Sequence, residues 1–192
     1  MTGTFTSDEI QRLLKHAEVQ MRAMIWLGIN CAFGNTDVAD LRWDDLDLEK
    51  GQVSLPRGKT GIRRDLPLWP ETISALRGVP RRGPLVFYTK AGKPWIRLIE
   101  GSRRPVDRIV EKFTVLLGRA GVDVQKGTGF YTLRRTAATI AAQSGDVFAV
   151  QGLLGHTDTK MASVYVQTVS AQTDKAVMAM RHWLTEDSEN PK

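Results

Sequence analysis

The chain has 192 residues, a length that fits one domain, and hydrophobic residues make up 42% of it, enough for an ordinary core. Lysine and arginine outnumber aspartate and glutamate by 27 to 21, a surplus that suits a polyanionic partner. The single cysteine, Cys31, excludes an intramolecular disulfide, the three scattered histidines lack metal-ligand spacing, and no apolar run reaches the roughly 18 residues of a membrane span. We therefore expect a cytoplasmic protein without a metal, a cofactor or a membrane segment.

The N-terminal part of the sequence predicts three helices. Thr6 and Glu9 have the spacing of a capping box, and the apolar residues that follow recur at helical intervals up to residue 17. A second, strongly apolar helix is expected over residues 19–31. Gly34 and its neighbour Asn35 break that pattern, and Thr36 can cap a third, short helix.

The middle of the chain changes to strand patterns. Residues 52–55 and 63–68 are short alternating segments joined by a turn at residues 58–61, which predicts a β-hairpin. Pro70 favours the start of a helix that continues to residue 76, and residues 85–87 resemble a third strand. A long helix is expected next because apolar residues form one stripe, namely Val106, Ile109, Val110, Phe113, Leu116 and Leu117.

The C-terminal part is predicted to be helical again. Helices are expected over residues 132–144, 147–154, 159–166 and 171–184, and residues 186–192 form a polar tail. The sequence therefore predicts an α+β fold that is mainly α-helical, with a small three-stranded antiparallel sheet, in one domain over residues 1–185.

Acidic and basic residues are segregated along the chain. Six acids fall between residues 37 and 49, and basic residues follow at once: Arg57, Lys59, Arg63 and Arg64. Further arginines occur in pairs or near one another at positions 81–82, 103–104, 108 and 134–135. This separation is expected if one face of the molecule meets DNA.

Four residues stand out by their order and spacing rather than individually. Alone, Arg134 reads as a surface arginine, His156 as a helix cap, Tyr165 as a core tyrosine and Lys59 as a solvated turn residue. Together they stand in the segments Tyr-Thr-Leu-Arg-Arg-Thr at 131–136, Leu-Gly-His at 154–156 and Lys-Thr-Gly at 59–61, and Tyr165 falls nine residues after His156.

This arrangement resembles the tyrosine recombinase, or phage integrase, family. Its motifs read His-x-Leu-Arg-His-Thr, then Leu-Gly-His, then a tyrosine nine residues later, with a Lys-Thr-Gly hairpin upstream. The resemblance covers nearly the whole chain in the correct order, and it implies the catalytic-domain fold of that family.

The resemblance also implies a mechanism and the residues that carry it. Tyr165 would attack a backbone phosphate to form a 3′-phosphotyrosyl link without ATP or a metal ion, and Lys59 would protonate the leaving 5′-oxygen. Arg134 would clamp the phosphate, and His156 would donate a hydrogen bond to it or help to move a proton. Tyr131 stands where the family has histidine. The DNA-binding residues expected beside this set are Arg135, which makes a phosphate contact or a salt bridge, and Arg57, Arg63, Arg64 and Arg42.

One departure from the family concerns its first motif, Gly-Leu-Arg-x-Ser-Glu-Leu. Here the corresponding segment, residues 32–38, has Gly34 at the position of the arginine, and Asp37 matches the glutamate. The loss of a phosphate-binding arginine is expected to cost about 3–4 kcal/mol of transition-state stabilisation, by analogy with an oxyanion donor. Arg42, Arg57 or Arg63 is a hypothetical substitute.

Three functions remain open from the sequence. The first is a site-specific recombinase or integrase; the second is a DNA-binding protein whose recombinase site has degenerated; the third is a topoisomerase or telomere-resolving relative with the same nucleophile. The resemblance implies double-stranded DNA as partner, a homotetramer on that DNA, and an N-terminal helical domain outside this chain. Residues 171–184 would then be exchanged between neighbours or pack on their own core.

Overall fold

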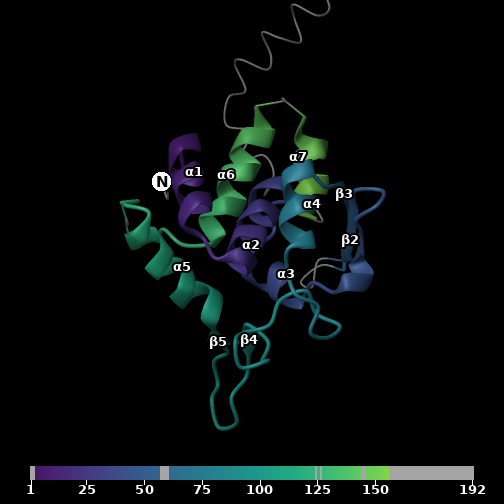
Figure 1. Cartoon of the computed structure of the whole chain (residues 1–192). Helices are drawn as coiled ribbons and strands as arrows, with labels where there is room; N and C mark the ends of the chain where they lie inside the picture. Colours follow the sequence, from purple (N-terminus) through teal and green to yellow (C-terminus); the bar gives the residue numbers. More distant parts are fainter. Residues whose placement is uncertain (1–2, 57–60, 124, 126, 144–145, 156–192) are drawn as a thin grey trace, which may run out of the picture.

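A computed structural model describes residues 3–56, 61–123, 125, 127–143 and 146–155. Helices dominate this part of the chain (Figure 1), as the sequence predicts. Their bounds are α1 Ser7–His16, α2 Val19–Asn30, α3 Asn35–Asp40, the 3-10 helix η1 Trp43–Asp45, α4 Pro70–Arg77, α5 Arg108–Arg119, α6 Tyr131–Ala142 and α7 Val147–Leu154. None of the described helices is long and apolar enough to cross a membrane.

Helix α2 is the centre of the core, with α1, α4 and α6 arranged around it in Figure 1. It is mostly apolar and most of its residues are buried, whereas Val19 and Arg22 leave one edge of the helix exposed. A Cβ atom added to Gly28 would lie 3.0 Å from the side chain of Leu133, so this glycine lets α2 approach α6 closely. The close approach places the start of α6 beside the segment that follows α2.

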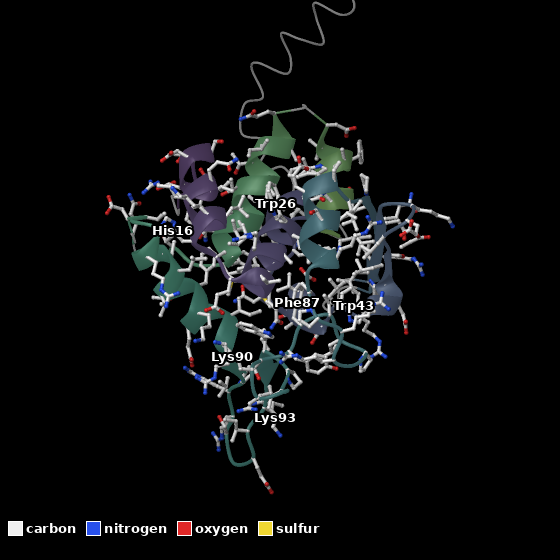
Figure 2. The ribbon with its side chains drawn as sticks, viewed as in Figure 1. His16, Trp26, Trp43, Phe87, Lys90 and Lys93 are labelled. Carbon is white, nitrogen blue, oxygen red and sulfur yellow. The ribbon has the colours of Figure 1, made fainter. Side chains whose placement is uncertain are left out.

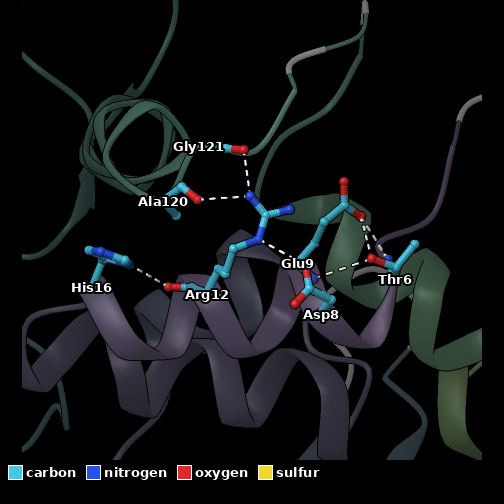
Figure 3. A network of polar contacts seen from close by, with 7 residues as sticks. All are labelled: Thr6, Asp8, Glu9, Arg12, His16, Ala120 and Gly121. Atoms are coloured by element: carbon cyan, nitrogen blue, oxygen red, sulfur yellow. Dashed lines mark hydrogen bonds and ion pairs between the residues drawn. The ribbon is translucent and has the colours of Figure 1, made fainter.

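The predicted capping box begins α1 (Figure 3). The Thr6 hydroxyl accepts the backbone N–H of Glu9, and the Glu9 carboxylate accepts the backbone N–H of Thr6. Arg12 leaves the same helix and donates to the carbonyl oxygens of Ala120 and Gly121, at 3.1 and 2.6 Å. Because these two residues directly follow the end of α5, Arg12 links α1 to that end of α5.

The sheet differs in one strand from the sequence-based expectation. The hairpin is confirmed as β2 (Gln52–Pro56) and β3 (Arg63–Pro67), but the third strand is β1 (Leu46–Asp47), in the order β1-β2-β3. Residues 85–87 were wrongly expected to be that strand. They make a single bridge, from Leu85 to Arg42, and the next two residues instead bury their side chains; Figure 2 shows Phe87 in the interior. This apolar run therefore packs into the core instead of adding a strand to the edge of the sheet.

A second small sheet precedes α5. It pairs β4 (Ile96–Arg97) with β5 (Val106–Asp107), which project from the helical body in Figure 1. Helix α5 therefore begins after Asp107, whose carboxylate caps it, and not at Val106 as the apolar stripe suggested. Most of the stripe is buried as predicted, whereas Val110 is exposed. Residues 156–192, which include the predicted helices 159–166 and 171–184 and the tail, lie outside the described residues.

Asn30, the last residue of α2, joins the hairpin to the helical core. Its amide nitrogen donates to the carbonyl oxygen of Pro67 at 2.9 Å. Its amide oxygen accepts the backbone N–H of Trp69 at 2.7 Å and the hydroxyl of Thr72 at 2.9 Å. One buried side chain therefore satisfies three groups between β3 and α4, and it fixes where β3 lies against α2.

Replacing Asn30 with alanine is expected to lower the free energy of unfolding by about 2–3 kcal/mol, because buried backbone groups lose their partner. Urea denaturation followed by circular dichroism measures this loss. The matched control is Asn35→Ala, since Asn35 makes one partly buried hydrogen bond, to Asp107. A loss in Asn30→Ala no larger than that of the control would contradict this role.

Candidate active site

Some of the expected site residues are not described. Lys59, Arg57, His156 and Tyr165 lie outside the described residues. The described members are Tyr131, Arg134 and Arg135 on α6, Arg63 and Arg64 on β3, and Arg42 before η1. Gly34 and Asp37, which belong to the first motif, lie at the start of α3.

Arg134 is buried and held by two backbone carbonyls. Its Nη1 donates to the carbonyl oxygen of Ala32 at 2.5 Å, and its Nη2 donates to that of Leu154 at 2.8 Å. Leu154 is the last residue of α7, so the guanidinium satisfies a carbonyl that a helix end leaves without an internal partner. Arg134 thereby links the segment before α3 to the end of α7, two residues before His156.

The backbone at Ala32 has an unusual conformation. Its φ is +52°, in the left-handed region that residues with a Cβ atom rarely adopt. The corresponding residue of the family motif is glycine, which adopts this region without strain. The left-handed residue contributes one of the two carbonyls that orient Arg134. The strained residue is therefore one that directly contacts the Arg134 guanidinium.

The Asp37 carboxylate accepts from three directions. Its Oδ2 accepts the backbone N–H of Gly34 at 2.8 Å and lies 3.6 Å from Nη1 of Arg134. Arg64 pairs with both oxygens: its Nη2 donates to Oδ1 at 2.6 Å, and its Nη1 donates to Oδ2 at 3.4 Å. Two buried guanidinium charges and one partly buried carboxylate charge give this trio a net charge of +1, which suits a single phosphodiester.

Arg64 was expected at the DNA surface, but its side chain is fully buried. Its guanidinium lies over the ring of Phe33, with Cζ 4.8 Å from the ring centroid, and pairs with Asp37. Strand alternation carries the signal for this position, since Arg64 shares the inward face of β3 with Leu66. Sequence analysis missed it because an arginine is rarely assigned to a buried face.

The neighbouring arginines point elsewhere. The Arg63 side chain is 70% exposed and pairs with Asp65 at 3.2 Å, on the outer face of β3. Arg42 is exposed, and its backbone bridges to residue 85. Arg135 donates to the carbonyl oxygen of Gly127 and to the hydroxyl of Thr132, at 3.1 and 2.9 Å. The described geometry therefore brings Arg64, and not Arg42 or Arg63, to Asp37 and Arg134.

The ring of Tyr131 lies next to the backbone of Gly34, where the first side-chain atom of a larger residue would be. A Cβ atom added to Gly34 would lie 3.3 Å from both Cδ2 and Cε2 of the Tyr131 ring, which is half-exposed. The two departures from the family motifs, glycine for arginine and tyrosine for histidine, are thus spatial neighbours. Any larger residue at position 34 requires the Tyr131 ring to shift.

Cys31 lies on the buried side of this site. Burial raises the pKa of the Cys31 thiol to about 12, although the positive charge of Arg64 acts in the opposite direction. Because a raised thiol pKa favours the neutral form, Cys31 stays protonated at physiological pH and behaves as a small apolar residue. It packs in the hydrophobic core and does not act as a nucleophile.

Comparison with known proteins gives consistent matches. The sequence pattern of the Phage integrase family matches residues 4–172. A tyrosine recombinase of Pseudothermotoga lettingae is 29% identical over 177 residues, which cover 88% of this chain and 57% of that protein. The chain therefore spans little more than half of the length of this relative.

Solved structures share the fold. The crystal structure of XerA recombinase has a TM-score of 0.70 and 21% identity, and the match covers 94% of this chain and 66% of that one. A lambda integrase tetramer bound to a Holliday junction has a TM-score of 0.64 and 19% identity, covering 85% of this chain and 47% of that one. These likenesses confirm the α+β fold that the motifs implied.

Proposed function

Because the chain belongs to the phage integrase family of tyrosine recombinases, we propose that it is the catalytic part of a site-specific recombinase that breaks and rejoins DNA through a 3′-phosphotyrosyl intermediate. The observation that carries the proposal is the buried Arg134, which Asp37 and two backbone carbonyls hold in one orientation. An arginine fixed before its ligand arrives stabilises developing phosphate charge without reorganisation during the reaction.

The proposed reaction needs no external energy source. The Tyr165 hydroxyl gives its proton to His156, and its oxygen bonds to the scissile phosphorus while the bond from phosphorus to the 5′-oxygen breaks. Lys59 supplies the proton that the leaving 5′-oxygen takes up. Attack by a 5′-hydroxyl on the phosphotyrosine reverses these steps and rejoins the strand. Arg134 and His156 stabilise the charge on the non-bridging oxygens throughout.

Duplex DNA and further copies of the chain are the proposed partners. The basic surplus of 27 to 21 supports DNA binding, since lysines and arginines displace counterions from phosphates. The lambda integrase neighbour is a tetramer on a Holliday junction, and a tetramer is the assembly we propose here. Arg63, Arg42 and Arg135 are proposed phosphate contacts beside the scissile position.

A second candidate function is DNA binding without cleavage. The Tyr131 ring favours it, because a Cβ atom at position 34 would lie only 3.3 Å from that ring, so the family arginine would be crowded where it leaves the backbone. The retained set of Lys59, Arg134, His156 and Tyr165 favours cleavage instead, since binding alone has no chemical use for a nucleophile and its acid.

Covalent adduct formation distinguishes the two functions. Duplexes from the DNA that flanks the coding sequence are first selected by gel shift, and a nick is then placed so that cleavage releases a short fragment. We expect a covalent protein–DNA adduct on denaturing gels that is absent from Tyr165→Phe. If the chain binds a duplex sequence-specifically but forms no adduct with it, cleavage is contradicted and the binding function stands.

The pair at positions 34 and 131 gives a separate prediction. In the same assay Gly34→Arg combined with Tyr131→His should raise the cleavage rate by about a hundredfold, because a phosphate donor is added and the ring that blocks it is removed. Gly34→Arg alone should give a smaller gain, and Tyr131→His alone serves as the control. Equal rates for the single and the combined variants would show that the two positions are independent.

A further inference from the structure

We propose that Arg64 compensates for the missing arginine at position 34 as a positioning residue: it holds the Asp37 carboxylate, and through Asp37 it fixes Arg134 for a phosphate. The inference rests on the proposed function for the identity of the phosphate, a DNA phosphodiester. The arrangement itself is independent of cleavage. It assigns Arg64 a role different from that of an arginine exposed on the DNA surface.

The first support is the location of the guanidinium. It lies between the ring of Phe33, the residue before Gly34, and the carboxylate of Asp37, three residues after it. Gly34 carries no charge, but a guanidinium lies beside it. That guanidinium belongs to β3 and not to the segment before α3. Neither Arg42 nor Arg63 is paired with Asp37 in the described structure, and both are exposed.

The second support is the bidentate pairing of Arg64 with Asp37. Nη2 of Arg64 donates to Oδ1 at 2.6 Å, and its Nη1 donates to Oδ2 at 3.4 Å. Oδ2 also accepts the backbone N–H of Gly34 and lies 3.6 Å from Nη1 of Arg134. Because Arg64 engages both oxygens, Asp37 is held in place and makes only a longer ion pair with Arg134, whose guanidinium donates to the carbonyls of Ala32 and Leu154.

The third support is the charge. With Arg64 present, the trio carries a net charge of +1; with a neutral residue at position 64, the charges of Asp37 and Arg134 would cancel. A buried ion pair is a weak device for stability, since apolar residues of similar volume often serve as well. Nε of Arg64 also has no acceptor within the described part of the chain. A role in holding Asp37 and Arg134 in place for a phosphate gives this buried charge a use.

The test uses the whole chain, with inorganic phosphate as the probe. The side-chain N–H resonance of Arg134, assigned with Arg134→Lys, is followed by NMR during a phosphate titration. We expect phosphate to shift this resonance, and Arg64→Gln or Arg64→Met to weaken the apparent affinity by about tenfold or more. Arg64→Lys, which keeps the charge, should recover most of it. Two neutral variants are made in case one of them does not fold, and thermal denaturation shows which of them is folded.

The control is Arg77→Met. Arg77 also pairs with a carboxylate, that of Glu49 at 3.1 Å, but both side chains are exposed and lie away from Asp37. It should leave phosphate affinity unchanged. If a folded neutral variant at position 64 binds phosphate as the wild type does and leaves the Arg134 resonance in place, the positioning role is overturned.

The cleavage assay separates this inference from the proposed function. A neutral variant at position 64 should slow adduct formation by about a hundredfold on a phosphodiester, and by much less on an uncharged methylphosphonate, whose charge no longer needs a partner. A purely structural defect would slow both substrates equally and would overturn the inference. If the wild type forms no adduct but position 64 still controls phosphate affinity, the recombinase function fails and the Arg64 assignment stands.

Discussion

The carboxylate of Asp37 is the interaction on which the rest of the site depends. It accepts the backbone N–H of Gly34 at the start of α3, pairs with Arg64 from β3, and faces Arg134 from α6. These three elements are far apart in the sequence, and two of them bring a buried positive charge. Without the carboxylate, the buried Arg64 would lose its charged partner, and Arg134 would keep its backbone carbonyl partners but lose this ion pair.

The same arrangement explains why the site is strained. Arg134 is held by the carbonyls of Ala32 and Leu154, and Ala32 adopts a left-handed backbone conformation that costs stability. Asn30 fixes β3 against the end of α2 from the other side. The fold therefore accepts a local cost in stability to keep the Arg134 guanidinium oriented, and this is the preorganisation that the proposed phosphate chemistry would use.

Much of this fold could be predicted from the sequence, because the helices and the hairpin depend on local patterns. The capping box at Thr6 and the bounds of α7 are examples. The third strand could not be predicted, since the apolar run at residues 85–87 is compatible both with a strand and with an irregular segment that packs into the core. The Arg64–Asp37 pair was missed for another reason. Strand alternation points Arg64 inward, but only its tertiary partner makes a buried arginine acceptable.

A double-mutant cycle between Asp37→Asn and Arg64→Met tests the central claim most directly. The free energy of unfolding of the wild type, both single variants and the double variant is measured by urea denaturation. The account predicts a coupling energy of about 2–3 kcal/mol, because each single change leaves a buried charge without its partner and the double change does not. Additivity to within about 0.5 kcal/mol would contradict it.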